Sequence, residues 1–94
     1  MNFLELFNEV AKLAKPAVAD TLKPVTDEHA PLKELGIDSL DLLMITVYLC
    51  EIFAIPEEIG KDLRPANVSD IVAFVTKNAT RMPGSVEEAL GLIS

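Results

Sequence analysis

Apolar side chains recur every three or four residues in three separate segments of this chain, and no segment shows the strict alternation of a β-strand. That spacing places the apolar side chains of each segment on one face of a helix. With only 94 residues, the chain has room for a single hydrophobic core. We therefore expect an all-α protein, a small bundle of three main helices and one short helix with a long first loop.

The first two segments are bounded by proline and glycine residues. The first helix is expected over residues 2 to 22, bent at Pro16, because proline lacks a backbone N–H donor. Residues 23 to 36 hold two prolines and a glycine and are expected to form the long loop. Its apolar residues should reach back into the core; they are Val25, Leu32 and Leu35.

The second helix has a clear start signal and an unusually apolar sequence. Asp38 is placed to cap the free N–H groups at its start, with Asp41 three residues on. Pro56 should end the helix after Phe53 or Ala54. Because this helix is apolar nearly all round, it is either deeply buried or exposes a docking face.

The remaining segments are shorter. Residues 57 to 65 are expected to form little more than a helical turn, and the cap signature at Asn67 predicts a last full helix over residues 68 to 78. After Pro83 and Gly84, a short amphipathic helix can begin at Ser85. We divide the chain into a main domain, residues 1–80, and a C-terminal tail, residues 81–94, and the sequence does not say whether that tail packs on the bundle.

Charge and hydropathy exclude several classes of partner. Eight Lys and Arg stand against 15 Asp and Glu, for a formal net charge of −7, which argues against nucleic acid or an anionic membrane as the partner. The longest apolar-rich run without charge, residues 42 to 50, is far shorter than the about 20 residues that a membrane span needs. The N-terminal sequence lacks a secretory signal pattern, so a cytoplasmic location is expected.

Residues able to perform catalysis or bind a metal are few. Cys50 is the only cysteine and His29 the only histidine, so neither an internal disulfide nor a structural zinc site is expected. Cys50 lies within an apolar helix, where a thiol normally packs as a small apolar group. His29 is interpreted as a solvated loop residue. We expect neither catalytic residues nor a resident metal.

Ser39 differs from these candidates because it lies at a helix N-terminus, just after a turn that contains glycine. Free backbone N–H groups and the positive end of the helix dipole favour a phosphate ester there. Asp38 and Asp41 could help to hold a divalent cation while such a group is attached. From its position alone, however, Ser39 would be interpreted as a helix cap.

The string Leu35-Gly36-Ile37-Asp38-Ser39-Leu40-Asp41, near the middle of a short acidic helical chain, resembles the acyl carrier proteins. The resemblance covers about residues 1 to 79. In that family the serine of Asp-Ser-Leu carries a 4′-phosphopantetheine arm, transferred from coenzyme A, whose thiol holds an acyl group as a thioester. The resemblance therefore implies an acyl-carrier-like bundle with cofactor-binding residues Ser39, the attachment site, and its neighbours Asp38 and Leu40.

On this interpretation the chain catalyses no reaction itself. Its expected partners are a phosphopantetheinyl transferase and acyl-loading, condensing or acyl-transferring enzymes of fatty acid, polyketide or specialised lipid biosynthesis. Family members hide the acyl chain between their helices. The residues expected to line that space, or simply to fill the core, are Leu49, Ile52, Phe53, Ile59, Leu63, Ile71 and Val75.

The second helix departs from the family pattern, in which its exposed side is strongly acidic. Asp41 and Glu51 are its only acids, and Met44, Cys50 and Ile52 occupy positions that resemble the family's acidic sites. Partners should therefore depend more on apolar packing, and the expected contact residues are Asp41, Met44, Val47 and Glu51. This departure favours a specialised pathway over housekeeping fatty acid synthesis.

Three alternatives remain open. A peptidyl or aminoacyl carrier shares the helices and the serine, and Asp38 argues weakly against it. An unmodified helical interaction module would use the apolar second helix to bind a partner, with Ser39 only a cap. A small hydrolase would need a base near Ser39, and His29 lies ten residues upstream in a loop. We expect the carrier to be a monomer in isolation.

Overall fold

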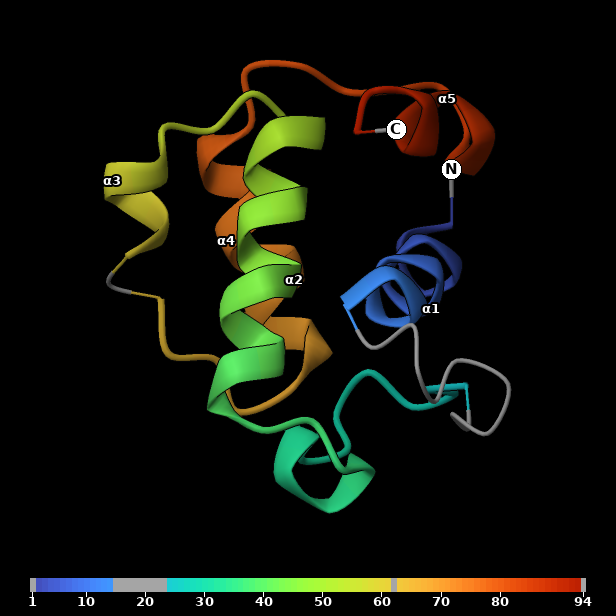
Figure 1. Cartoon of the computed structure of the whole chain (residues 1–94), viewed down its shortest axis with the longest axis vertical. Helices are drawn as coiled ribbons and strands as arrows, with labels where there is room; N and C mark the ends of the chain where they lie inside the picture. Colours follow the sequence, from blue (N-terminus) through green and yellow to red (C-terminus); the bar gives the residue numbers. More distant parts are fainter. Residues whose placement is uncertain (1, 15–23, 62, 94) are drawn as a thin grey trace.

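The computed structural model describes residues 2–14, 24–61 and 63–93, which form five α-helices and one short 3-10 helix and contain no strand. The expected all-α class is therefore confirmed. The elements in chain order are α1 (Phe3–Ala14), η2 (Leu32–Leu35), α2 (Ser39–Ile52), α3 (Glu57–Gly60), α4 (Val68–Asn78) and α5 (Val86–Gly91) (Figure 1).

Helix α2 is the centre of the arrangement. It packs against α1 on one side and α3 on the other, and α1 also contacts α4 and α5. Figure 1 shows α1 with α5 and, across the molecule, α3, with α2 and α4 between them. As a result, α2 has one face in the core and another toward α3.

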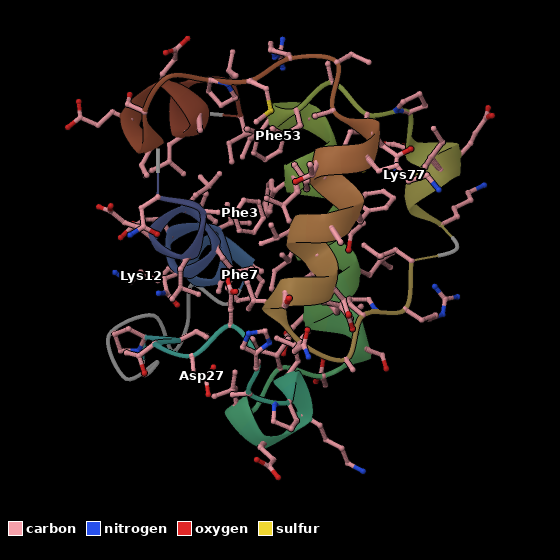
Figure 2. All side chains as sticks on the ribbon, turned by 180° about the vertical axis from the view of Figure 1, so that it is seen from behind. Phe3, Phe7, Lys12, Asp27, Phe53 and Lys77 are labelled. Atoms are coloured by element: carbon pink, nitrogen blue, oxygen red, sulfur yellow. The ribbon has the colours of Figure 1, made fainter. Side chains whose placement is uncertain are left out.

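The core is built from the apolar faces of α1, α2 and α4, together with the turn that follows α2. Its largest fully buried side chains are Phe7, Phe53, Leu6, Ile45, Ile52, Ile71, Val10 and Val68. Phe3 stacks on Phe53, with ring centroids 6.1 Å apart and planes inclined by 23°, which connects α1 to the end of α2 (Figure 2). Burial of these apolar groups is the main force that holds the bundle together.

Most predicted helix bounds are confirmed. Helix α2 begins after the Asp38 cap and ends at Ile52 with Phe53 as its C-cap, and α4 spans residues 68–78 as expected. Helix α1 covers the first part of the predicted 2–22 helix, and the rest of that prediction, including Pro16, lies outside the described residues. Leu13, which shares the apolar stripe of α1 in the sequence, is 46% exposed.

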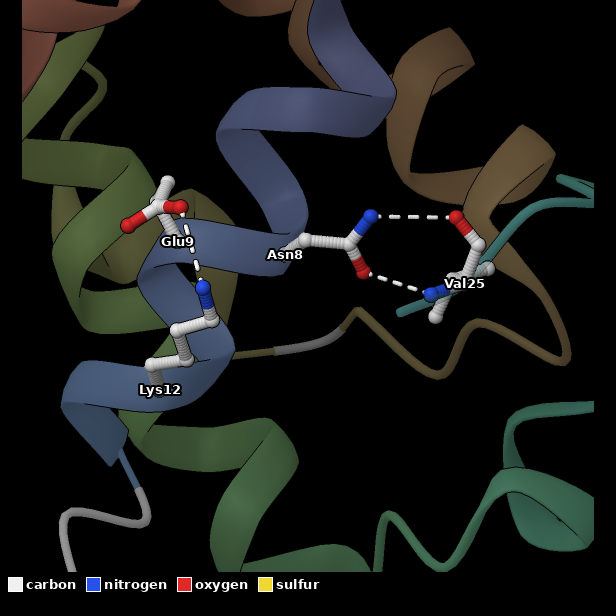
Figure 3. Close-up of polar contacts among 4 residues, drawn as sticks. All are labelled: Asn8, Glu9, Lys12 and Val25. Carbon is white, nitrogen blue, oxygen red and sulfur yellow. Dashed lines mark hydrogen bonds and ion pairs between the residues drawn. The ribbon is translucent and has the colours of Figure 1, made fainter. Parts of the chain in front are cut away.

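The long loop before α2 is held by specific contacts that its sequence does not predict. Val25 and Leu32 are buried as expected. The side-chain amide of Asn8 on α1 donates to the carbonyl of Val25 at 3.0 Å and accepts from its backbone N–H at 2.7 Å (Figure 3). One side chain thus satisfies both backbone groups of Val25 and fixes the loop to α1.

The C-terminal segment shares the core with the rest of the chain. The predicted short helix is present as α5, capped by the Ser85 hydroxyl, which accepts from the backbone N–H of Glu88 at 3.1 Å. Ala89 of α5 is fully buried, and α5 packs on α1. The C-terminal tail therefore packs on the bundle, a point that the sequence left open. None of the described helices is long and apolar enough to cross a membrane.

Candidate functional site

Ser39 is the first residue of α2, and a reciprocal pair of hydrogen bonds fixes the backbone around it. The Asp38 carboxylate accepts from the backbone N–H of Asp41 at 2.9 Å, and the Asp41 carboxylate accepts from the N–H of Asp38 at 3.2 Å. This capping box satisfies donors that a helix start leaves free, as the sequence predicted. It holds Ser39 between two fixed residues.

The loop that leads into Ser39 is also fixed. Gly36 ends η2 in the left-handed conformation, with φ of 78°, which glycine adopts without strain. Next to it, Ile37 is buried and its N–H donates to the carbonyl of Leu32 at 3.2 Å. The Leu32 N–H in turn donates to the carbonyl of Ala66 at 2.9 Å, which connects this loop to the segment before α4. Ser39 therefore follows a turn that these hydrogen bonds fix in place.

The side chain of Ser39 is exposed, and its hydroxyl makes no hydrogen bond to the described residues. His29, the candidate base in the sequence argument, lies in another turn. Its backbone N–H donates to the Asp27 carboxylate at 2.9 Å, and its ring Nε2 lies 3.7 Å from a carboxylate oxygen of Glu28. No group of three or more potential metal-ligating side chains occurs among the described residues. The hydroxyl is accessible to an external reagent.

Apolar side chains dominate the exposed side of α2 near Ser39. Leu40 is 70% exposed, Leu43 56% and Met44 39%, while Val47 is half-buried and Glu51 exposed. Together, Leu40, Leu43, Met44, Val47 and Glu51 form what we call the α2 surface. Sequence reasoning anticipated Met44, Val47 and Glu51 as contact residues but did not include Leu43, which is exposed beside them.

One expectation about this side of α2 is wrong, and another is confirmed. Asp41 is only 9% exposed and its carboxylate is engaged in the capping box, so it does not present a charge to a partner. Cys50 and Ile52 are buried in the core, as the sequence predicted for a thiol and an isoleucine of an apolar helix. Burial raises the pKa of the Cys50 thiol, and the negative charge of Glu57 adds to the rise.

A groove runs between α2 and α3 and begins at Ser39. It consists of two adjoining hollows of about 310 and 150 Å³ that share Leu43, Thr46, Gly60 and Lys61. The first hollow is also lined by Ser39, Leu42, Leu63 and Arg64, and the second by Val47, Cys50 and Glu57. We call this feature the α2–α3 groove.

The residues that line the α2–α3 groove differ from those that the sequence suggested. Leu49, Ile52, Phe53, Ile71 and Val75 are packed in the solid core, so they fill space rather than line it. Of the expected lining residues only Leu63 lines the groove, and Ile59 is 42% exposed. Sequence reasoning missed Gly60, where a Cβ atom would lie 3.0 Å from Cys50 Sγ and 3.2 Å from Thr46 Cγ2. That closeness brings α3 against α2.

The surroundings of Ser39 fit a 4′-phosphopantetheine arm. The hydroxyl that would carry its phosphate is exposed at the start of a helix of 14 residues, where free N–H groups favour negative charge. The space beyond Gly36 is open, because a Cβ atom there would meet nothing within 4 Å. The α2–α3 groove extends directly from Ser39.

Comparison with protein-family models, with curated proteins and with solved structures found no match for this chain.

Proposed function

We propose that this chain is an acyl carrier protein that holds acyl intermediates as thioesters on a 4′-phosphopantetheine arm attached to Ser39. The observation that carries the proposal is the exposed Ser39 hydroxyl, held at the start of α2 by the Asp38–Asp41 capping box within the Asp-Ser-Leu motif. The arm would supply the thiol that bears the acyl group.

Each residue near Ser39 has a distinct part in this proposal. Ser39 Oγ is the acceptor oxygen, and a phosphopantetheinyl transferase transfers the arm to it from coenzyme A. The Ser39 O–P bond forms as the pyrophosphate bond of coenzyme A breaks, which releases adenosine 3′,5′-bisphosphate and the proton of the hydroxyl. Asp38 keeps the helix start in place through its bond to the Asp41 N–H. Leu40, 70% exposed beside the serine, is available for contact with the transferase.

The α2 surface supports a docking role for partner enzymes. Leu43 and Met44 expose apolar area next to the attachment site, and Glu51 supplies the one exposed acid of α2. Acyl-loading, condensing or acyl-transferring enzymes would bind it mainly by apolar packing, and Met adapts well to irregular surfaces. This recognition favours a specialised lipid or polyketide pathway, with the carrier acting as a cytoplasmic monomer.

Intact mass measurement tests the proposal. The protein is incubated with coenzyme A, magnesium and a broad-specificity phosphopantetheinyl transferase that is active on a control carrier. The wild type should gain one phosphopantetheinyl group and Ser39→Ala none. Ser85→Ala is the matched control, because Ser85 also lies at a helix start and is exposed; it should gain the group like the wild type. An unchanged wild-type mass would contradict the proposal.

A second candidate function rests on the α2 surface itself. Exposed Leu40 and Leu43 are the kind of apolar anchors by which an unmodified interaction module binds a partner helix. Such a module would keep its apo mass in the same experiment, with Ser39 acting only as a helix residue. If the arm is attached, a further experiment separates an acyl carrier from an aminoacyl carrier. The holo protein is incubated with acyl donors or with aminoacyl donors, each with its transferase, and the mass of the product shows which group is loaded.

A further inference from the structure

Arg64 and Ser39 line the same hollow of about 310 Å³, at the start of the α2–α3 groove. Arg64 is exposed and lies in the segment between α3 and α4. Lys61 also lines this hollow, but it lines the second hollow as well, where Glu57 supplies a carboxylate. Of the two hollows, Arg64 lines only the one at Ser39. It is therefore the cation that belongs to the Ser39 end of the groove.

Backbone carbonyls hold one nitrogen of the Arg64 guanidinium and leave one edge of the group open. Nη1 donates to the carbonyl oxygens of Lys61 at 2.8 Å and Leu63 at 2.9 Å. Nε and Nη2 donate to none of the described residues. These two nitrogens form the edge by which a guanidinium makes two parallel N–H···O bonds to a phosphate or a carboxylate.

The acids around Ser39 do not neutralise this cation. Arg64 forms no ion pair with a carboxylate of the described residues, although acids outnumber bases by 15 to 8 in the chain. Asp38 and Asp41, on either side of Ser39, accept from each other's backbone N–H in the capping box. An anion attached at Ser39 would therefore meet both an unpaired cation and the positive end of the α2 dipole.

We propose that Arg64 binds the phosphate of the 4′-phosphopantetheine arm through Nε and Nη2, and so fixes the direction in which the arm leaves Ser39. This inference rests on the proposed function, because it needs an arm at Ser39. A phosphodiester there offers a negative charge and two unbridged oxygens, which match the open edge of the guanidinium. The arm would then leave on the side of Leu63 and Arg64. Leu40, which is 70% exposed and does not line this hollow, would stay uncovered for a partner enzyme.

The two arginines of the chain provide an internal comparison for an NMR test. Arg64 Nε has no partner among the described residues, whereas Arg81 Nε donates to the carbonyl oxygen of Ile52 at 3.0 Å. ¹H–¹⁵N spectra are recorded for the apo protein and for the holo protein, whose mass shows the attached arm. The Arg64 Nε–H resonance should move in the holo protein, and its exchange with water should slow by up to about fivefold, the protection expected from one exposed ion pair. The Arg81 resonance should stay in place.

The phosphorus resonance of the holo protein measures the same contact from the arm. In holo Arg64→Gln its chemical shift should move from the wild-type value toward that of the holo protein unfolded in urea. Holo Arg64→Lys keeps the charge but loses the planar fork, so its shift should lie between the two. Lys12→Gln removes one positive charge on α1, across the bundle from α3, and should keep the wild-type shift (Figure 1).

The outcomes separate this inference from the proposed function. A wild type that gains no arm in the mass measurement would overturn both. A holo protein whose Arg64 Nε–H resonance and exchange match those of the apo protein would overturn this inference alone. Identical phosphorus shifts in holo wild type and holo Arg64→Gln would do the same. Added sodium chloride should return both resonances toward their unpaired positions, because salt screens an exposed ion pair.

Discussion

Arg81 closes the carboxyl end of α2, because its Nε donates to the carbonyl oxygen of Ile52 at 3.0 Å. The same guanidinium also donates through Nη2 to the carbonyl of Glu51, and the N–H groups of Thr80 and Arg81 both donate to that of Phe53. A helix end leaves its last carbonyls without intrahelical partners, and a cation there also complements the helix dipole. The segment after α4 therefore completes α2.

Replacing Arg81 with alanine should destabilise the fold. The loss of charged hydrogen bonds to the α2 carbonyls should lower the free energy of unfolding by about 1–2 kcal/mol, since the side chain is partly solvated. Urea unfolding followed by circular dichroism measures the change. Lys77→Ala is the control, because Lys77 is exposed and its side chain makes no hydrogen bond or ion pair to the described residues. Equal stability of the two variants would contradict the cap.

The Asn8 bridge in Figure 3 makes a prediction about the loop before α2. Asn8→Ala removes both bonds to Val25, and should cost about 2 kcal/mol because two buried backbone groups lose their partner. Asn8→Asp keeps the acceptor for the Val25 N–H but places a carboxylate oxygen against its carbonyl, so it should also destabilise. Hydrogen exchange at the Val25 amide should accelerate in Asn8→Ala. Unchanged protection there would show that the bridge does not hold the loop.

The fold class and the helix bounds near Ser39 could be predicted because they depend on local signals. Helical spacing of apolar residues, the Asp38 cap and the Asn67 cap each act within a few residues, and the structure retains all three. The position of Ser39 at the start of α2 follows from the same signals. These features need no knowledge of which helix lies beside which.

The remaining features depend on contacts between distant residues. The rotation of α2 about its axis decides how far Leu43 and Met44 are exposed, and a sequence that is apolar nearly all round gives only a weak signal for that rotation. The bond from Arg81 to Ile52 spans 29 residues and the Asn8 bridge spans 17. The cap signature predicted the hydrogen bond between Asp41 and Asp38, which engages the Asp41 carboxylate within the protein. The sequence argument nevertheless assigned the charge of Asp41 to a partner.

The buried thiol of Cys50 makes a prediction about pH. Burial, with Glu57 adding to it, raises the pKa of the thiol, so alkylation by iodoacetamide should need a higher pH in the folded protein than in urea. A pKa raised in the folded state contributes stability that is complete below the unfolded pKa and is lost as pH rises through the folded pKa. Cys50→Ala should remove this alkaline loss. An alkylation profile identical in folded and unfolded protein would refute the prediction.

Gly60 controls the spacing of α2 and α3, and its replacement should change both stability and the groove. In Gly60→Ala the new methyl group would lie 3.0 Å from Cys50 Sγ and 3.2 Å from Thr46 Cγ2, closer than ordinary van der Waals contact, so these side chains or α3 must shift. Overpacking of this kind costs about 1–3 kcal/mol. Gly91→Ala is the matched control, because a Cβ atom at this helical glycine meets nothing within 4 Å, and the change should be neutral or stabilise by up to about 1 kcal/mol. Thermal unfolding of the two variants measures the difference.

Because Gly60 also lines both hollows of the α2–α3 groove, only Gly60→Ala should shift the amide resonances of Thr46 and Lys61. Equal stability and unchanged resonances in both variants would show that α3 does not pack on α2 through this glycine.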